Sequence, residues 1–148
     1  MAEDWASRTA DQLDSQKKAE QQKEERATQR RQILEEQGPL IWKKVLAGIR
    51  GQVGEFNKRE GDKLLIEVDD GKSITIVSKV SERHRNVTAS LGKDYAINYY
   101  GQIISDPAAS RAGSFAMRVA DDNQIMLREN GVEKAVDDVV AAILDALI

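Results

Sequence analysis

Apolar residues recur at helical spacing between residues 39 and 58. Consecutive residues of an α-helix are rotated by about 100°, so these apolar side chains fall on one narrow face. We therefore predict an amphipathic helix over residues 39–58 whose apolar face covers a core. The positions on this face are Trp42, Val45, Leu46, Ile49, Val53 and Phe56.

After residue 61 the apolar pattern changes to every second residue, which is the period of a half-buried β-strand. Short polar turn signals, such as Asp69-Asp70-Gly71, separate the alternating segments. Connections this short predict antiparallel strands that are neighbours in the sheet. Residues 105–114 are predicted to be a loop because they contain Pro, Gly and Ser. The predicted strands are 63–68, 73–80, 87–91, 95–104, 115–120 and 124–129.

A second helix is predicted after these strands. Asn130 can cap it, with Glu133 three residues later as the capping-box partner. Apolar residues at positions 132, 136, 139, 140, 143 and 147 share one face of this helix. The predicted fold class is α+β: an antiparallel meander sheet of about five to six strands, with the amphipathic helix and the C-terminal helix packed on one face.

Residues 1–38 form a charged segment rich in good helix formers, with seven basic and nine acidic residues. Its large apolar residues are too few for a heptad seam. A helix that is polar on all sides has three possible explanations. It spans solvent between parts of a structure, it depends on a partner for stability, or it is only partly helical. The large apolar residues of this segment are Trp5, Leu13, Ile33 and Leu34.

Gly38-Pro39 follows this segment. Glycine can end a helix in the left-handed conformation, and proline can occupy the first turn of the next helix. We therefore predict two parts: a charged helical arm over residues 1–38, hereafter the arm, and a single α+β domain over residues 39–148.

The composition narrows the range of functions. The chain has 148 residues, 32% of them charged, a net charge of −3 and no cysteine. Disulfides, thiolate zinc sites and cysteine nucleophiles are therefore excluded. The first twenty residues lack an apolar run, and no stretch is long and apolar enough to span a bilayer. We expect a cytoplasmic protein with no membrane contact.

Three glycines interrupt the predicted amphipathic helix at a spacing of three: Gly48, Gly51 and Gly54. They match neither a Walker loop nor a dinucleotide-binding loop, because they lie inside a helical pattern. On a regular helix they project away from the apolar face. Two interpretations remain open: the outer face simply tolerates glycine, with or without a kink, or the glycines form a groove for another helix.

The candidates for chemistry are few. The single histidine, His84, has arginine on both sides, which disfavours its protonated form and repels a metal cation. A solvated loop histidine is the simplest interpretation. The surrounding basic cluster, Lys79, Arg83, His84 and Arg85, could bind an anion. We predict no catalytic residue, metal ligand or cofactor.

Nucleic-acid binding is a weaker hypothesis because the chain is acidic overall. Tyr95 and Tyr99 share the parity of Ile97 and are predicted to face the core, so Tyr100 alone does not make a stacking surface. The basic residues considered for this role are Arg26, Arg30, Arg31, Lys43 and Lys44.

The function that this sequence favours is a non-enzymatic protein-interaction or self-assembly module that uses the arm, with a homo-oligomer or another protein as the expected partner. The alternative is a small-ligand binder or enzyme with a pocket between sheet and helices, near His84 or residues 105–114. The predicted partner interface consists of Gly48, Gly51, Gly54, Trp5, Leu13, Ile33 and Leu34.

Overall fold

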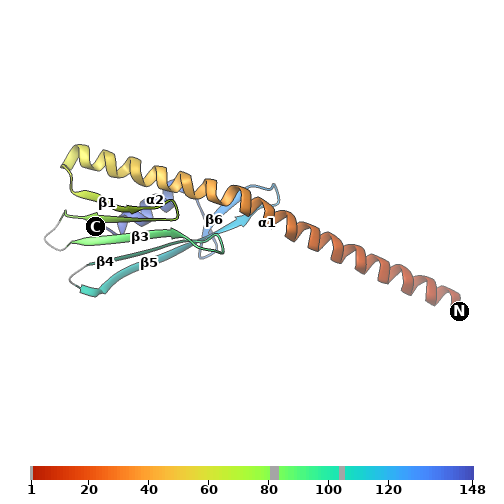
Figure 1. The fold of residues 1–148 in the computed structure, drawn as a ribbon. Coiled ribbons are helices and arrows are strands. Elements are labelled where there is room, and N and C mark those ends of the chain that lie inside the picture. Colours follow the sequence, from red (N-terminus) through yellow and green to blue (C-terminus); the bar gives the residue numbers. More distant parts are fainter. Residues whose placement is uncertain (1, 81–83, 104–105) are drawn as a thin grey trace.

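The computed structural model describes residues 2–80, 84–103 and 106–148. Seven strands form one antiparallel sheet in which each strand lies beside the next one in the sequence. Helix α1 runs along this sheet and continues far beyond it (Figure 1). Helix α2 packs on the same face of the sheet as α1. The elements are α1 Ala2–Glu60, β1 Leu64–Asp69, β2 Ser73–Ser78, β3 Arg85–Leu91, β4 Ile97–Ile103, β5 Asp106–Val119, β6 Ile125–Glu129, β7 Val132–Lys134 and α2 Val136–Asp145.

The predicted α+β meander is confirmed, with seven strands in place of five to six. Both helices cover one face of the sheet, and their apolar residues join those of the strands in a single core. This arrangement follows from the alternating pattern of the strands, which leaves one face that must be removed from water. The largest fully buried side chains are Trp42, Phe115, Ile49, Ile74, Ile76, Ile97 and Ile143.

The prediction of a helix break at Gly38-Pro39 is wrong, because α1 continues through both residues. Gly38 is buried, and a Cβ atom at this position would lie 2.9 Å from Cδ1 of Tyr95. Glycine is therefore present to let the β3–β4 turn approach the helix. Pro39 removes the amide that would bond to the carbonyl of Glu35. Glu35 is exposed, so water can satisfy that carbonyl.

We expect Pro39→Ala to raise the free energy of unfolding by roughly 2 kcal/mol. Alanine restores the missing amide hydrogen bond in the helix interior, which stabilises the folded state. Proline stabilises the protein by restricting the unfolded chain, and losing this smaller effect only partly offsets the gain. Urea denaturation followed by circular dichroism measures this difference. An unchanged or lower stability would instead support a separate helix that begins at Pro39.

Residues 106–114 belong to strand β5, so the predicted loop over 105–114 is wrong for the described residues. The glycine that suggested a loop has a packing role: a Cβ atom on Gly113 would lie 2.4 Å from Cε1 of Tyr99, which is paired with it across β4 and β5. The Tyr99 ring covers the bare backbone and stacks on Phe115, with ring centroids 6.0 Å apart. The predicted inward orientation of Tyr99 is consistent with this packing.

The predicted cap of the C-terminal helix at Asn130 is also wrong. Asn130 and Gly131 have φ of 52° and 80° and form the tight turn between β6 and β7. Asn-Gly favours such a turn because both residues tolerate positive φ. Helix α2 begins later, at Val136, where the carboxylate of Asp138 accepts a hydrogen bond from the Ala135 amide at 2.9 Å.

The β1–β2 turn is held by the Asp70 carboxylate. It accepts hydrogen bonds from the amides of Ser73 at 2.8 Å and Lys72 at 3.0 Å. These two amides, Ser73 first, hold the pKa of Asp70 below its ordinary value of 3.8. Because the folded-state pKa is depressed, the ionised carboxylate stabilises the fold above the unfolded-state pKa. That contribution is lost as pH falls through the folded-state pKa.

We therefore expect Asp70→Asn to destabilise the protein at neutral pH and to have a smaller effect below pH 3.8, where the wild-type carboxyl is being protonated. The asparagine oxygen accepts the same hydrogen bonds without the charge. Urea midpoints of both proteins across this pH range measure the effect. A difference that stays constant with pH would show that the charge of Asp70 contributes nothing.

Candidate functional site

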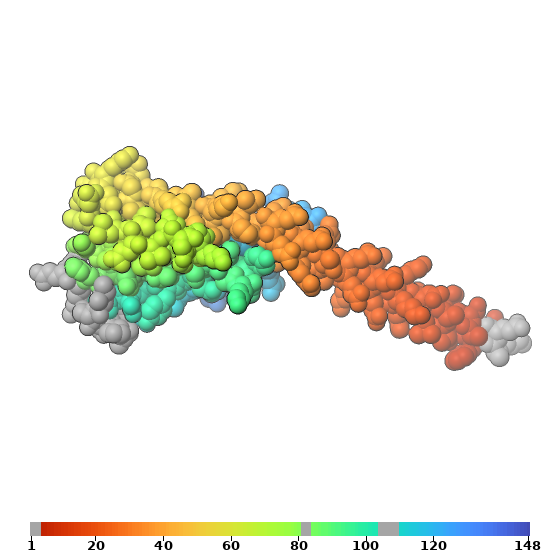
Figure 2. Space-filling model, viewed as in Figure 1, coloured from red at the N-terminus to blue at the C-terminus, as the bar shows by residue number. Residues whose placement is uncertain are grey.

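The most prominent surface feature is the N-terminal part of α1, which projects from the domain as an isolated helix (Figures 1 and 2). All side chains from residue 10 to residue 25 are exposed. Near its end, Trp5 is 65% exposed and Leu13 is 52% exposed. Residues 4–25 are called the exposed arm from here on, and residues 4–14 the arm tip. Tryptophan is one of the residue types enriched among the residues that dominate binding at protein interfaces.

The exposed arm ends where α1 meets the turn between β5 and β6. Arg26 donates hydrogen bonds to the carbonyl of Ala120 at 3.1 Å and to Oδ1 of Asn123 at 2.5 Å. Arg30 lies 3.6 Å from the carboxylate of Asp121. Two of the arginines considered for nucleic-acid binding therefore contact the domain of their own chain.

The four apolar residues of the arm divide into two pairs. Leu34 packs against the core and Ile33 is partly buried, whereas Trp5 and Leu13 are exposed. Leu34 therefore anchors α1 on its own domain. A partner role for all four residues stays a prediction, and Trp5 and Leu13 are the two that are exposed.

The three glycines of α1 do not share one environment. A Cβ atom on Gly48 would lie 2.8 Å from Cγ2 of Val140 in α2, so Gly48 lets the two helices approach closely. The prediction that Gly48 projects away from the packed side is therefore wrong. Gly51 and Gly54 face open space, with no atom within 4 Å of such a Cβ. Their contact with a partner stays a prediction.

We expect Gly51→Ala and Gly54→Ala each to raise the free energy of unfolding by about 0.5–1 kcal/mol, because alanine restricts the unfolded chain and fits the open space. Gly48→Ala should bring no such gain, because Val140 must shift. Chemical denaturation measures these effects. If light scattering also shows weaker self-association of the Gly51 and Gly54 variants, these glycines form a helix-binding groove.

The predicted anion-binding cluster is only partly assembled. Lys79 and His84 are exposed, while Arg83 lies outside the described residues. The guanidinium of Arg85 donates to the backbone carbonyl of Ile148, after α2. The guanidinium of Arg85 is thus already hydrogen-bonded to Ile148. Anion binding at this cluster stays a prediction.

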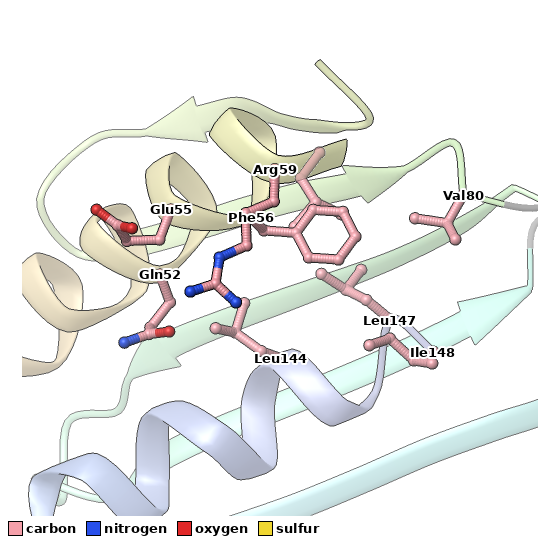
Figure 3. Close-up of a pocket in the computed structure, with 9 residues that line it drawn as sticks. Gln52, Glu55, Phe56, Arg59, Val80, Leu144, Leu147 and Ile148 are labelled. Atoms are coloured by element: carbon pink, nitrogen blue, oxygen red, sulfur yellow. The ribbon is translucent and has the colours of Figure 1, made fainter. Parts of the chain in front are cut away.

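A pocket of about 380 Å³ opens between α1, α2 and the sheet (Figure 3). Its floor is apolar, and Gln52, Glu55 and Arg59 project from α1 at its rim. We call it the helix-end pocket, because it lies near the C-terminal ends of both helices. Its lining residues are Gln52, Glu55, Phe56, Arg59, Leu64, Val80, Leu144, Leu147 and Ile148.

The alternative predicted from the sequence was a pocket between sheet and helices near His84 or residues 105–114, and the described residues that line the helix-end pocket include none of these. Its walls come from α1, β1, the segment after β2 and the end of α2. No local motif marks this combination. Phe56 and Leu147 were both predicted on apolar faces that pack on the core, and these were the signals in the sequence.

Tyr99 is a titratable group whose pKa is shifted by its surroundings. Burial, followed by the charge of Glu129, raises the pKa of Tyr99, whose ring packs in the core. The phenol therefore stays protonated at neutral pH and acts as a packing residue. Within the described ranges, no three His, Asp or Glu side chains gather in a way that could hold a metal ion.

The helices of the described residues include none that is long and apolar enough to cross a membrane. Comparison with protein-family models, with curated proteins and with solved structures finds no match to this chain.

Proposed function

We propose that this chain is a non-enzymatic self-assembly module in which the exposed arm contacts a second copy of the protein. The observation that carries the proposal is the exposure of Trp5 and Leu13 on a helix that projects from the domain. Tryptophan is enriched among the few interface residues whose truncation costs about 2 kcal/mol or more of binding free energy. The arm tip therefore has the composition of a contact site.

The continuity of α1 supports the proposal further. The same helix contributes Trp42 and Ile49 to the core and carries the exposed arm. The arm is therefore held in a fixed direction by the domain. A preformed helix loses less conformational freedom on association than a disordered tail does.

Light scattering on the full chain and on a chain that lacks residues 2–25 tests the proposal. We expect the full chain to show a mass that rises with concentration towards a dimer or higher oligomer. The truncated chain keeps every core residue and should remain monomeric with the same unfolding midpoint. A full chain that is monomeric at high concentration would contradict the proposal.

A second candidate function is the binding of a small amphiphile, which the helix-end pocket favours. The pocket combines an apolar floor of Phe56, Leu144 and Leu147 with the cation of Arg59 at its rim. A ligand with an apolar tail and a carboxylate would match both features. Thermal denaturation with decanoate tests this candidate, since binding to the folded state raises the melting temperature. No shift at saturating decanoate would count against it.

A further inference from the structure

We infer that the outward face of strands β2 to β5 binds a neutral polysaccharide. Helices α1 and α2 pack on the other face of the sheet (Figure 1). The inference goes beyond the proposed self-assembly and does not depend on it, because no residue of α1 belongs to this outward face. We call the surface the open face, and it consists of residues 73, 75 and 77 of β2, 86, 88 and 90 of β3, 98, 100 and 102 of β4, and 110, 112 and 114 of β5.

The strand register aligns these twelve residues in three rows across the sheet. The residues between them, such as Ile76, point to the core. With about 4.8 Å between strands and about 7 Å between rows, the open face measures roughly 14 Å in each direction. It is therefore wide enough for several sugar rings. The middle row is Thr75, Thr88, Tyr100 and Ala112.

The open face carries no charged residue, although 32% of the chain is charged. At that frequency about four of the twelve residues would be charged. Nine of them are Ser, Thr, Asn or Gln instead, and of the twelve only Val77 is buried. Strand formation does not explain this composition, because asparagine is depleted in strands and the open face has Asn86 and Asn98. The amide and hydroxyl groups therefore indicate a binding role.

The polar side chains of the open face are partly held in place by one another. The hydroxyl groups of Thr75 and Thr88 are hydrogen-bonded at 2.9 Å, and the Ser114 hydroxyl donates to Oδ1 of Asn98 at 2.8 Å. Side chains as short as these also lose less conformational freedom on binding than lysine or glutamate does. The open face is therefore preorganised for a ligand that forms hydrogen bonds.

A sugar chain matches this chemistry. Hydroxyl and amide groups both donate and accept hydrogen bonds, as the hydroxyl groups of a sugar do. Tyr100 lies near the centre of the open face and is 46% exposed. Its ring offers an apolar surface for the C–H groups of a sugar ring, and its hydroxyl adds a polar contact. A neutral ligand fits best, because the open face has no charge with which to pair an ionic one.

Other classes of partner fit the open face less well. Nucleic acid requires cations for its phosphates, and the alternation along β5 reaches a charged residue only at Arg118, beyond the pairing with β4. The cores of protein interfaces are enriched in Trp, Met and Arg and depleted in Ser and Ala. A membrane surface requires an apolar face with cations around it. The open face has none of these compositions.

Co-sedimentation of the full chain with insoluble cellulose, chitin, mannan and starch tests the inference, with cross-linked pectate as an anionic control. We expect the chain to bind at least one of the four neutral polysaccharides and not to bind pectate. The bound fraction should be the same from about 0.05 M to about 0.5 M salt, because the open face carries no charge that salt could screen. Binding to none of the four, or binding that salt abolishes, would overturn the inference.

Three variants place the binding site. Tyr100→Ala should raise the dissociation constant for the bound polysaccharide at least about ten-fold. Ala112→Lys should do the same, because it puts a long charged side chain beside Tyr100. Leu40→Ala is the matched control, since Leu40 is 52% exposed on α1 and lies outside the open face. All three positions are exposed, so the domain should fold in each variant, and circular dichroism verifies this.

The outcomes separate this inference from the proposed function. If the chain binds a polysaccharide but Tyr100→Ala and Ala112→Lys bind it equally well, the open face is not the site and the inference is wrong. If Tyr100→Ala weakens self-association in light scattering and no polysaccharide binds, the open face is a protein interface and the inference is also wrong. A chain that binds polysaccharide as a monomer would support the inference and contradict self-assembly.

Discussion

Replacing Trp42 with alanine is expected to lower the free energy of unfolding by about 3–5 kcal/mol, a large part of the stability of a domain of this size. Trp42 is 2% exposed and is the largest of the fully buried side chains. Its indole Nε1 donates a hydrogen bond to the carbonyl of Gly71 at 2.9 Å. The residue therefore joins α1 to the β1–β2 turn through both apolar contact and a hydrogen bond.

Urea denaturation measures this loss, and Trp42→Phe separates the two contributions. Phenylalanine keeps most of the apolar contact and removes the hydrogen bond, so we expect it to cost less than alanine does. Trp5, on the exposed arm, supplies a second tryptophan signal that does not depend on the core. A loss of less than about 1 kcal/mol for Trp42→Ala would contradict the placement of Trp42 in the core.

Introducing proline at Ala19, in the middle of the exposed arm, is expected to unfold the arm and weaken self-association at least about ten-fold. Proline in an exposed helix interior costs about 3 kcal/mol. The segment before residue 19 would be a short isolated helix of 17 residues without contacts to the domain, and a helix only slightly longer than about 12–15 residues gains little stability in water. It accounts for 17 of the 69 residues in α1 and α2, so about a quarter of the helical circular dichroism should be lost.

The unfolding midpoint of the domain should not change in Ala19→Pro, because residue 19 is exposed and precedes the contacts made by Arg26. Ala19→Gly is the matched control: it weakens the helix by about 1 kcal/mol without removing an amide, so its effect on association should be smaller. Unaltered self-association of Ala19→Pro would mean that the arm need not be a helix when it binds.

Much of the domain could be predicted from periodicity. The apolar face from Trp42 to Val53 is buried, as its helical spacing indicates. The turns at Asp69-Asp70-Gly71 and Asp121-Asp122-Asn123 connect antiparallel neighbours, because their residues favour tight turns wherever they occur. In these places the local preference and the tertiary structure agree.

The errors arise where a local signal has two physical meanings. Gly38 suggests the end of a helix, but it is needed because Tyr95 packs against its backbone from a distant turn. Gly113 suggests a loop, but it is needed because Tyr99 of the neighbouring strand packs against its backbone. Asn130 serves equally as a helix cap and as the first residue of a hairpin turn, and Gly131 directly after it favours the turn.

The candidate site was predictable only in part. The exposed arm follows from the polarity of residues 4–25, since a helix without an apolar face has nothing to bury. The helix-end pocket depends on how Phe56, Leu144 and Val80 meet in space, and these residues come from three distant segments. Tertiary packing brings these residues together, and the apolar periodicity of a single segment does not predict which distant segments meet.

Amide hydrogen exchange of residues 4–25 at low and high protein concentration tests most directly whether the arm is the site of self-association. An exposed helix that makes no tertiary contacts opens readily and exchanges fast. If a second copy covers the arm, its amides should exchange at least about ten-fold more slowly at high concentration, while those of the core strands stay the same. Fast exchange of the arm at every concentration would contradict self-assembly through the arm.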